Sequence, residues 1–217
     1  MCSEAIASGA FLLWRIPLSN TNAPNGFQFF RLQEGSAATQ GKEPGLIKSD
    51  YTTAIGYGDL VIRHTDGYLR RKAAADAIAA FGVFVGCSYL LTATNQIIQS
   101  KSWPGSGNTG DVTAYVEANP SGLYVGQATL TAITLANIGE NIDISVGTPD
   151  SEVAGGFSTS SLDASTLATT STLPWQIYGL LSDYYGSAQN GTDNTASYNR
   201  VIVKPNNWAA KQLTGIA

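Results

Sequence analysis

Residues 79–90 read AAFGVFVGCSYL, and this stretch decides the fold class. It is an apolar run of strand length that contains three aromatic residues and two valines, which is typical of a buried β-strand. Gly82 and Gly86 interrupt the run. A glycine inside a strand indicates a bulge, or the close approach of another strand or an aromatic ring. The stretch therefore predicts one wall of a tightly packed β structure.

Cys87 lies in this run between Gly86 and Ser88. It is either a reactive thiol in a pocket or a small residue in the β wall. No basic residue lies nearby in the sequence to lower the thiol pKa, and a free cysteine among apolar residues packs as a small hydrophobe. We therefore expect Val83, Val85 and Cys87 to share the core face of the strand. The chain has two cysteines, Cys2 and Cys87, too few for a disulfide framework; a bond between the two stays open, but nothing in the sequence requires it.

Further strand signals follow at intervals of roughly 10–20 residues, separated by turn signals such as Asp66-Gly67. These segments are GDLVIRHTDGYLRR, NQIIQSKSWPGSG, DVTAYVEANP, SGLYVGQATL, WQIYGLLS and NRVIVKPN. In DVTAYVEANP, Val112, Ala114 and Val116 share one face. The best helical candidate is a short turn over residues 132–139, and no longer amphipathic helix is present to serve as a parallel crossover. The pattern predicts an all-β fold, a mainly antiparallel barrel or sandwich, with one short helix.

Residues 1–50 are dense in Asn, Gly, Pro and Ser, which are turn and loop residues. They also carry several aromatic residues, which is unusual for a disordered linker. We therefore expect two parts: an extended, loop-like N-terminal arm over residues 1–50, and a β-rich core over residues 51–217. The arm is expected to pack on its own core or on a neighbouring subunit. Residues 158–174 are rich in Ser and Thr and are expected to form a polar loop.

The charge pattern argues against nucleic acid and membranes as partners. The chain has 12 Lys and Arg against 16 Asp and Glu, a net charge of −4. Nucleic-acid binding normally needs a basic stripe, and the nearest approach to one is Arg63, Arg70, Arg71 and Lys72, which we interpret as a solvated hairpin end. No signal peptide is recognisable, and no apolar run reaches the roughly 18 residues of a membrane span.

The residue inventory does not suggest catalysis. His64 is the single histidine, so a Ser-His-Asp or Cys-His device would have to use it, and it lies two residues before the expected Asp66-Gly67 turn. One histidine and two distant cysteines do not make a zinc site. The acidic residues considered for calcium, which do not fit an EF-hand loop, are Glu140, Asp143, Asp183 and Asp193. We therefore expect no enzymatic activity, no catalytic residue, no cofactor and no metal site.

The order of the segments resembles a family of bacteriophage capsid structural proteins, the decoration or cement proteins of tailed phages. The resemblance is carried by AIGYGDLVIRHTDGYLRR, AIAAFGVFVGCSYL and SKSWPGSGNTGDVTAYVEANPSGLYVGQA, and it continues in NIGENIDI, SLDASTLATTSTLPWQIYGL and NRVIVKPNN. NAPNGFQFFRL looks like the Gly-Phe segment near the N-terminus of the family. Together these segments span residues 20–207.

The resemblance implies a β-rich, non-enzymatic protein on the outer surface of the capsid in the virion. Its partners would be the major capsid protein and further copies of itself in a homotrimer, and it would use no cofactor. Aromatic side chains buried between subunits are common interface anchors. The candidate contact residues are Trp14, Phe27, Phe29, Phe30, Trp103, Tyr184 and Tyr185.

An alternative is a carbohydrate-binding or host-attachment module of the virion. Trp103, Tyr184 and Tyr185 lie near expected loops, where aromatic rings could stack on sugar rings. A hydrolase is a third alternative, but the inventory lacks a nameable catalytic set. Core packing remains the simpler explanation for any single tryptophan.

Overall fold

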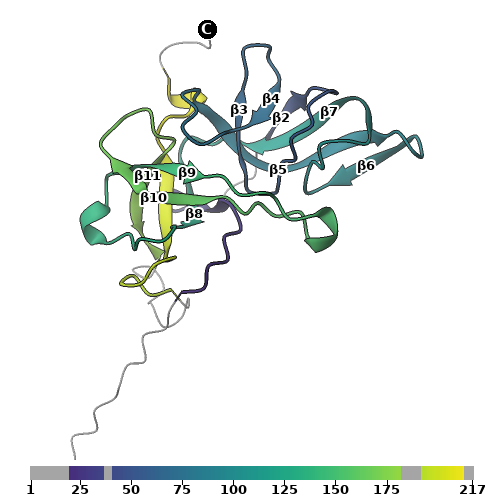
Figure 1. Ribbon diagram of the computed structural model, residues 1–217. Helices are drawn as coiled ribbons and strands as arrows, with labels where there is room; N and C mark the ends of the chain where they lie inside the picture. Colours follow the sequence, from purple (N-terminus) through teal and green to yellow (C-terminus); the bar gives the residue numbers. More distant parts are fainter. Residues whose placement is uncertain (1–19, 37–40, 182–191, 213–217) are drawn as a thin grey trace, which may run out of the picture.

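The computed structural model describes residues 20–36, 41–181 and 192–212, and these fold into β-strands with three short 3-10 helices (Figure 1). The strands are β1 (Gln28–Leu32), β2 (Lys42–Ile47), β3 (Leu60–Arg63), β4 (Leu69–Arg71), β5 (Ala80–Leu91), β6 (Gln96–Ser100), β7 (Asn108–Glu117), β8 (Gly122–Gln127), β9 (Asn141–Ser145), β10 (Ser161–Ala168), β11 (Trp175–Leu180) and β12 (Arg200–Pro205). The helices are η1 (Leu135–Asn137), η2 (Glu152–Ala154) and η3 (Ala209–Lys211). The all-β fold class is confirmed, and η1 lies within the predicted short helix.

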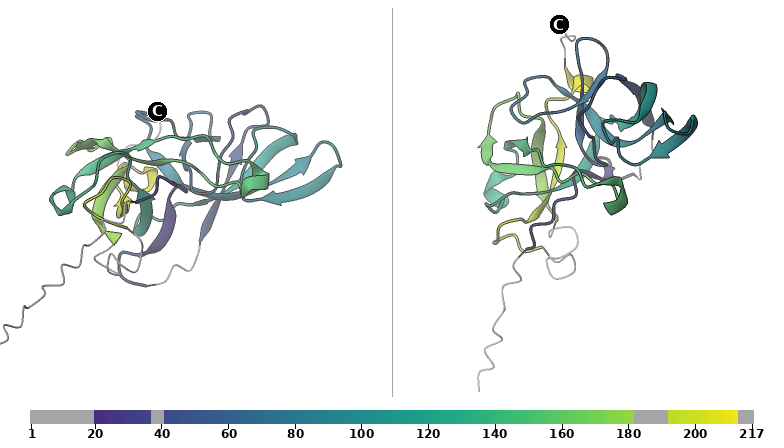
Figure 2. Two further views of the ribbon diagram at one scale, coloured as in Figure 1. Left: turned by 60° about the horizontal axis from the view of Figure 1, so that its bottom comes forward. Right: turned by 45° about the vertical axis from the view of Figure 1, so that its right-hand side comes forward.

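The strands form two mainly antiparallel sheets that lie side by side (Figures 1 and 2). The first sheet has the order β1-β8-β12-β11-β9-β10. This sheet is curved: Ala128, directly after β8, forms an isolated bridge with Leu162 of β10, although β8 and β10 are not neighbours in the strand order. The second sheet has the order β2-β7-β5-β3-β4, with β6 paired to β5. Both sheets therefore combine strands that are far apart in the sequence.

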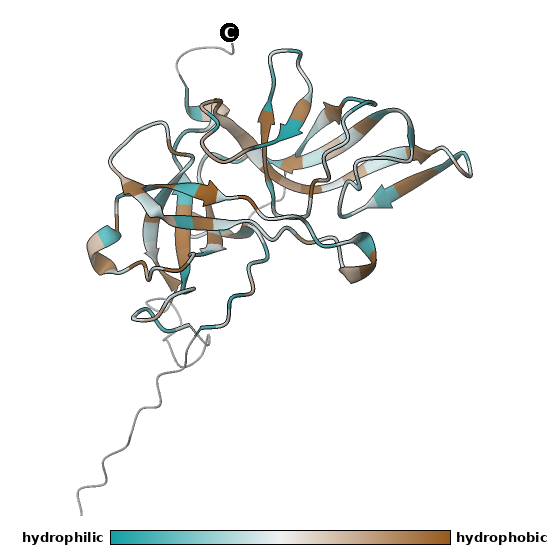
Figure 3. Cartoon of the chain, in the orientation of Figure 1, coloured by the Kyte–Doolittle hydropathy of each residue, from teal (hydrophilic) through white to brown (hydrophobic). Residues whose placement is uncertain are grey.

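Each sheet has a core of its own, and the first core also joins the two sheets. In the first core, the ring of Trp175 lies 5.0 Å from that of Phe27 and 5.2 Å from that of Trp208. Leu60 and Val83 of the second sheet are buried in this same cluster. The second core contains the predicted inward face of β7, Val112, Ala114 and Val116. Hydrophobic and hydrophilic residues alternate along many strands, as expected for sheets with one buried face (Figure 3).

The opening stretch forms β5, as predicted, but the expectation that Val83, Val85 and Cys87 share one core face is wrong. Val83 is buried in the first core and Cys87 in the second, whereas Val85 is half-buried. The register between β5 and β7 shifts between Phe84 and Gly86. A bulge at this point adds one residue to β5, so Phe84 and Cys87 turn toward the same core. Gly86 therefore correctly predicted a bulge, but the assumption that side chains alternate without interruption across it was wrong.

The predicted division between residues 50 and 51 is wrong for the described part of the arm. β1 pairs with β8 in the first sheet, and β2 pairs with β7 in the second. Upstream of β1, the side-chain amide of Asn20 donates to the carbonyls of Asp193, Ala196 and Ser197 at 2.8–3.3 Å. Residues 20–36 and 41–50 are therefore part of the β core, because they pair and hydrogen-bond with strands and loops of the core that lie far along the chain.

Residues 158–174 were predicted as a polar loop, and this is wrong because the whole of β10 lies there. Leu162 and Ala164 are buried in the first core, and Asp163 between them and Ser165 after them are more exposed. This is ordinary strand alternation, hidden by the Ser and Thr content. Its partner β9 was also not identified as a strand.

A buried polar network links the second sheet to the segment that leads into β10. Asp59, just before β3, accepts hydrogen bonds from the hydroxyls of Ser158 and Ser160 at 2.6 and 2.7 Å. The guanidinium of Arg71 in β4 pairs with the same carboxylate, and it also donates to the Gly147 carbonyl. A buried carboxylate is stable only when its charge is paired and its oxygen atoms accept hydrogen bonds. Here Arg71 pairs with the charge, and the two serine hydroxyls donate the hydrogen bonds.

The expected solvated hairpin end is only partly correct. Arg70 pairs with Asp66 at 2.6 Å on the surface, as expected. Lys72 is instead buried, and the Arg71 side chain is only 9 % exposed. The Lys72 ammonium donates to the carbonyls of Asp76 and Ile78 at 2.6 and 2.9 Å. Adjacent residues on a strand point to opposite faces, so consecutive basic residues in the sequence do not form a single basic surface.

Candidate functional site

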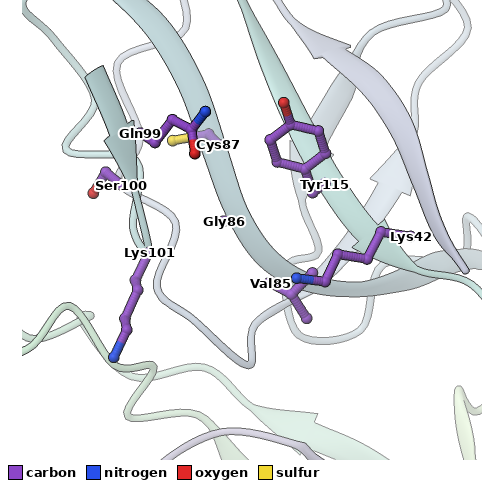
Figure 4. Close-up of a pocket in the computed structure, with 8 residues that line it drawn as sticks. All are labelled: Lys42, Val85, Gly86, Cys87, Gln99, Ser100, Lys101 and Tyr115. Carbon is purple, nitrogen blue, oxygen red and sulfur yellow. The ribbon is translucent and has the colours of Figure 1, made fainter. Parts of the chain in front are cut away.

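A groove of about 360 Å³ crosses the outer face of the second sheet, from β2 over β7 and β5 to the end of β6. Figure 4 shows the side chains that line it. They are Lys42, Val85, Gly86, Cys87, Gln99, Ser100, Lys101 and Tyr115. Tyr115 alternates with the buried residues of β7, so its ring lies on the face away from the second core.

The floor of the groove is formed at Gly86, beside the β5 bulge. Gly86 has a φ of +142°, and a Cβ atom there would lie 2.9 Å from the carbonyl oxygen of Ser100. Both facts demand glycine. In the sheet register, Gly86 lies opposite Tyr115, and its neighbour Cys87 lies opposite Ser100. The absence of a side chain at Gly86 therefore lets the Ser100 backbone approach closely, and the groove forms a hollow over this glycine with Tyr115 in its lining.

Two lysines flank this hollow from opposite sides (Figure 4). Lys42 begins β2 and lies opposite Glu117 of β7 in the register. Lys101 follows the last residue of β6, and its ammonium lies 5.6 Å from the centroid of the Phe157 ring. Both side chains are exposed. Within the described ranges, neither lysine makes a hydrogen bond or an ion pair.

The carboxyl groups near the groove neutralise these lysines only in part. Glu117 is 8 % exposed; burial raises its pKa, and the charge of Lys42 opposes that rise. Glu152 accepts a hydrogen bond from the Ser100 hydroxyl at 2.6 Å. Neither carboxylate forms an ion pair with Lys42 or Lys101. The two ammonium groups therefore remain available to a ligand.

The nucleophiles in the lining are poorly placed for covalent chemistry. The Cys87 thiol is 1 % exposed and donates to the Ser102 carbonyl at 3.4 Å. Burial, and to a smaller extent the charge of Glu152, raises the thiol pKa to about 12. Such a thiol stays protonated and unreactive at neutral pH. The groove lining includes no histidine or carboxylate.

His64 lies in the β3–β4 turn, as predicted. Its Nδ1 atom lies 3.3 Å from an Asp66 oxygen and 3.4 Å from the Thr65 hydroxyl. A catalytic relay needs the nucleophile and the carboxylate on different ring nitrogens. Here both contacts use the same nitrogen, and the arrangement is that of a polar turn.

In the described ranges, no group of three or more His, Cys, Asp or Glu residues is arranged to hold a metal ion. Asp143 accepts hydrogen bonds from the backbone N–H groups of Ala75 and Ile144, and Asp193 accepts from Thr195. Asp183 lies outside the described residues. The same described ranges contain no helix with the length and apolar character needed to cross a membrane.

The predicted contact residues have different locations. Phe27 and Trp103 are each 1 % exposed, so they are core residues and their prediction as interface residues is wrong. The Trp103 ring meets Tyr89 edge-on at 5.3 Å. Phe29 and Phe30 are half-buried, and their contact role stays a prediction. The remaining three candidates, Trp14, Tyr184 and Tyr185, lie outside the described residues.

The groove was not predicted, although the sequence contained part of its signal. The alternation in β7 assigned Tyr115 to the outer face, and Gly86 was identified as a site of bulging or close approach. Lys42 gave no signal, because β2 meets β7 only through long-range pairing. Lys101 follows β6, which forms a local hairpin with β5, and its charge alone did not indicate a groove.

Comparisons of this chain with protein-family models, with curated proteins and with solved structures found no match.

Proposed function

We propose that this chain is a non-enzymatic decoration protein, which binds the outside of an icosahedral phage head and stabilises it by bridging neighbouring capsid subunits. The partners are the major capsid protein and two further copies of the chain in a homotrimer. The proposal begins from the resemblance over residues 20–207. The structural observation that carries it is the outer face of the second sheet, where an open groove is lined by two exposed lysines that make no hydrogen bond or ion pair within the described residues.

The exposed apolar residues on this face also support a protein contact. Leu46 in β2 and Ile97 in β6 are 48 % and 73 % exposed. In the strand alternation, Leu46 shares its face with Lys42, and Ile97 shares its face with Gln99. Apolar side chains beside polar groove residues are the composition expected of a contact surface with a polar rim.

The interior of the chain suits a bridging role. A protein that joins capsid subunits bears load between its contacts, so its two sheets must not separate. The shared first core and the buried Asp59–Arg71 network both connect the sheets. In a trimer, each contact with the head would be repeated, and weak contacts would then act together.

The stability of phage heads tests this function. Heads prepared with and without the chain are compared for DNA release during heating and on dilution into low salt. We expect heads without the chain to release DNA at a lower temperature, and added chain to restore their resistance. Equal resistance of the two preparations would contradict a cementing role.

A second candidate is a virion carbohydrate-binding module, favoured by Tyr115 beside the open glycine floor. A half-buried tyrosine with Gln99 nearby could stack on a sugar ring and donate hydrogen bonds to it. Binding on a glycan array that is lost in Tyr115→Ala would support this candidate, and an array without binding would count against it.

A further inference from the structure

We propose that the groove between Lys42 and Lys101 receives an acidic peptide segment, whose carboxylate side chains reach the two ammonium groups. This inference deepens the proposed function and rests on it in one respect: the segment is taken to belong to a capsid subunit. The chemistry of the groove itself is argued from the described residues alone.

The first argument concerns the lysines of the chain. Three of the six make a hydrogen bond or an ion pair through the ammonium group: Lys48 pairs with Asp50, Lys72 donates to two carbonyls, and Lys211 donates to the Pro205 carbonyl. The other three, Lys42, Lys101 and Lys204, make no hydrogen bond or ion pair within the described ranges. Two of these three line one groove. Within the described residues, no carboxylate forms an ion pair with either ammonium group of the groove.

The second argument is charge complementarity. The chain as a whole carries a net charge of −4, so most of its surface does not attract an acidic partner. A local pair of lysines on such a surface would fix where, and in which orientation, an acidic segment docks. Complementary charge acts in this way on registration and encounter rate more than on raw affinity.

The third argument concerns the shape of the site. The groove crosses several strands and is open, which fits a length of chain better than an enclosed small molecule. The floor at Gly86 lets a side chain approach the β5 backbone, and the Tyr115 hydroxyl is available to donate a hydrogen bond. The exposed Leu46 and Ile97 would contact apolar residues that flank the acidic ones.

The first experiment measures the affinity of the full chain for purified heads that lack it. The charge-reversal variant Lys42→Glu/Lys101→Glu is compared with Lys204→Glu, which changes a lysine that is also without a partner but lies on the first sheet. We expect the double variant to bind about tenfold more weakly or worse, because like charges now face each other. We expect the control to stay within about twofold of the wild type, since it lies outside the contact. Thermal unfolding of each variant confirms that it folds.

The outcomes separate this inference from the proposed function. If the wild type binds heads and the double variant binds equally well, the acidic-segment inference is wrong and the decoration function stands. If the wild type does not bind heads, the decoration function is wrong, and a second measurement then tests whether the groove binds an acidic peptide.

That measurement is an NMR titration of the ¹⁵N-labelled full chain with hexaglutamate, with hexalysine and sodium sulfate as controls. The inference predicts chemical-shift changes at Gly86, Ser100 and Tyr115 with hexaglutamate alone, and their loss in Lys42→Glu/Lys101→Glu. Equal changes with sulfate would show a general anion site and overturn the peptide assignment. No change at these three amides would overturn it as well.

Discussion

The Nε atom of Arg71 lies 2.8 Å from the Oδ2 atom of Asp59, and both side chains are buried. The other carboxylate oxygen of Asp59 accepts from Ser158 and Ser160, so one acidic group connects β4 with the segment leading into β10. A buried ion pair is weak evidence for stability on its own, since desolvation opposes the attraction. Removal of only one partner of the pair strongly lowers stability, because the charge that remains is buried without a partner.

We therefore expect Asp59→Ala to lower the free energy of unfolding by about 3–5 kcal/mol, since it leaves the Arg71 guanidinium buried and uncompensated. The matched control is Asp66→Ala, which removes the exposed partner of Arg70 and should cost less than about 1 kcal/mol. Urea unfolding followed by tryptophan fluorescence measures both. Equal losses in the two variants would mean that the buried network does not hold the sheets together.

Phe27 tests whether the segment before β1 belongs to the core. Its ring packs 5.0 Å from that of Trp175, and its side chain is fully buried. Phe27→Ala should therefore cost about 3–5 kcal/mol, the range for truncating a buried aromatic side chain. The exposed Leu135 is a control, and Leu135→Ala should change stability by no more than about 0.5 kcal/mol. A Phe27→Ala protein as stable as the wild type would restore the view of this segment as a separable arm.

The Cys87 thiol should react only when the chain unfolds. Burial limits access to it and raises its pKa to about 12, so the native protein contains almost no thiolate at pH 8. In a Cys2→Ser background, where Cys87 is the single thiol, reaction with Ellman's reagent should be slow in buffer and complete within seconds in denaturant. Rapid reaction of the native protein would reopen the alternative of a reactive thiol.

Glu117 predicts a pH dependence of a definite sign. Burial raises its pKa in the folded chain above the ordinary value of 4.5. The folded state therefore holds the proton more tightly than the unfolded state, and the stability that this contributes is present below pH 4.5 and is lost as the pH rises through the folded pKa. Glu117→Gln should remove this loss.

The variant should thus gain stability relative to the wild type between pH 4 and pH 7. Urea unfolding of both proteins at the two pH values measures the difference. A stability difference that is the same at both would show that Glu117 has an ordinary pKa.

Local patterns predicted the strands whose residues alternate clearly or form long apolar runs. β7 is the best case, since the inward Val112, Ala114 and Val116 followed from period-two alternation alone. β10 was missed because Ser and Thr occupy its outer face and part of its inner face, and composition then resembles that of a loop. β1 and β2 were assigned to an arm because their partners β8 and β7 lie about 70 to 100 residues away, a separation that no local pattern reveals.

The candidate site depended still more on long-range pairing. Tyr115 and Gly86 could each be assigned a role from their own strands, but Lys42 reaches them only through the β2–β7 pairing. The aromatic residues chosen as contact candidates did not identify the site. Phe27 and Trp103 are core residues, since large aromatic side chains bury most apolar area when they pack inside.

The most direct test of the decoration proposal is a cryo-electron microscopy map of the virion or of heads reassembled with this chain. The account predicts copies repeated over the outside of the icosahedral shell, with the face that carries Lys42, Tyr115 and Lys101 against a capsid subunit. A few copies at the tail, or copies on the shell whose groove faces solvent, would contradict it.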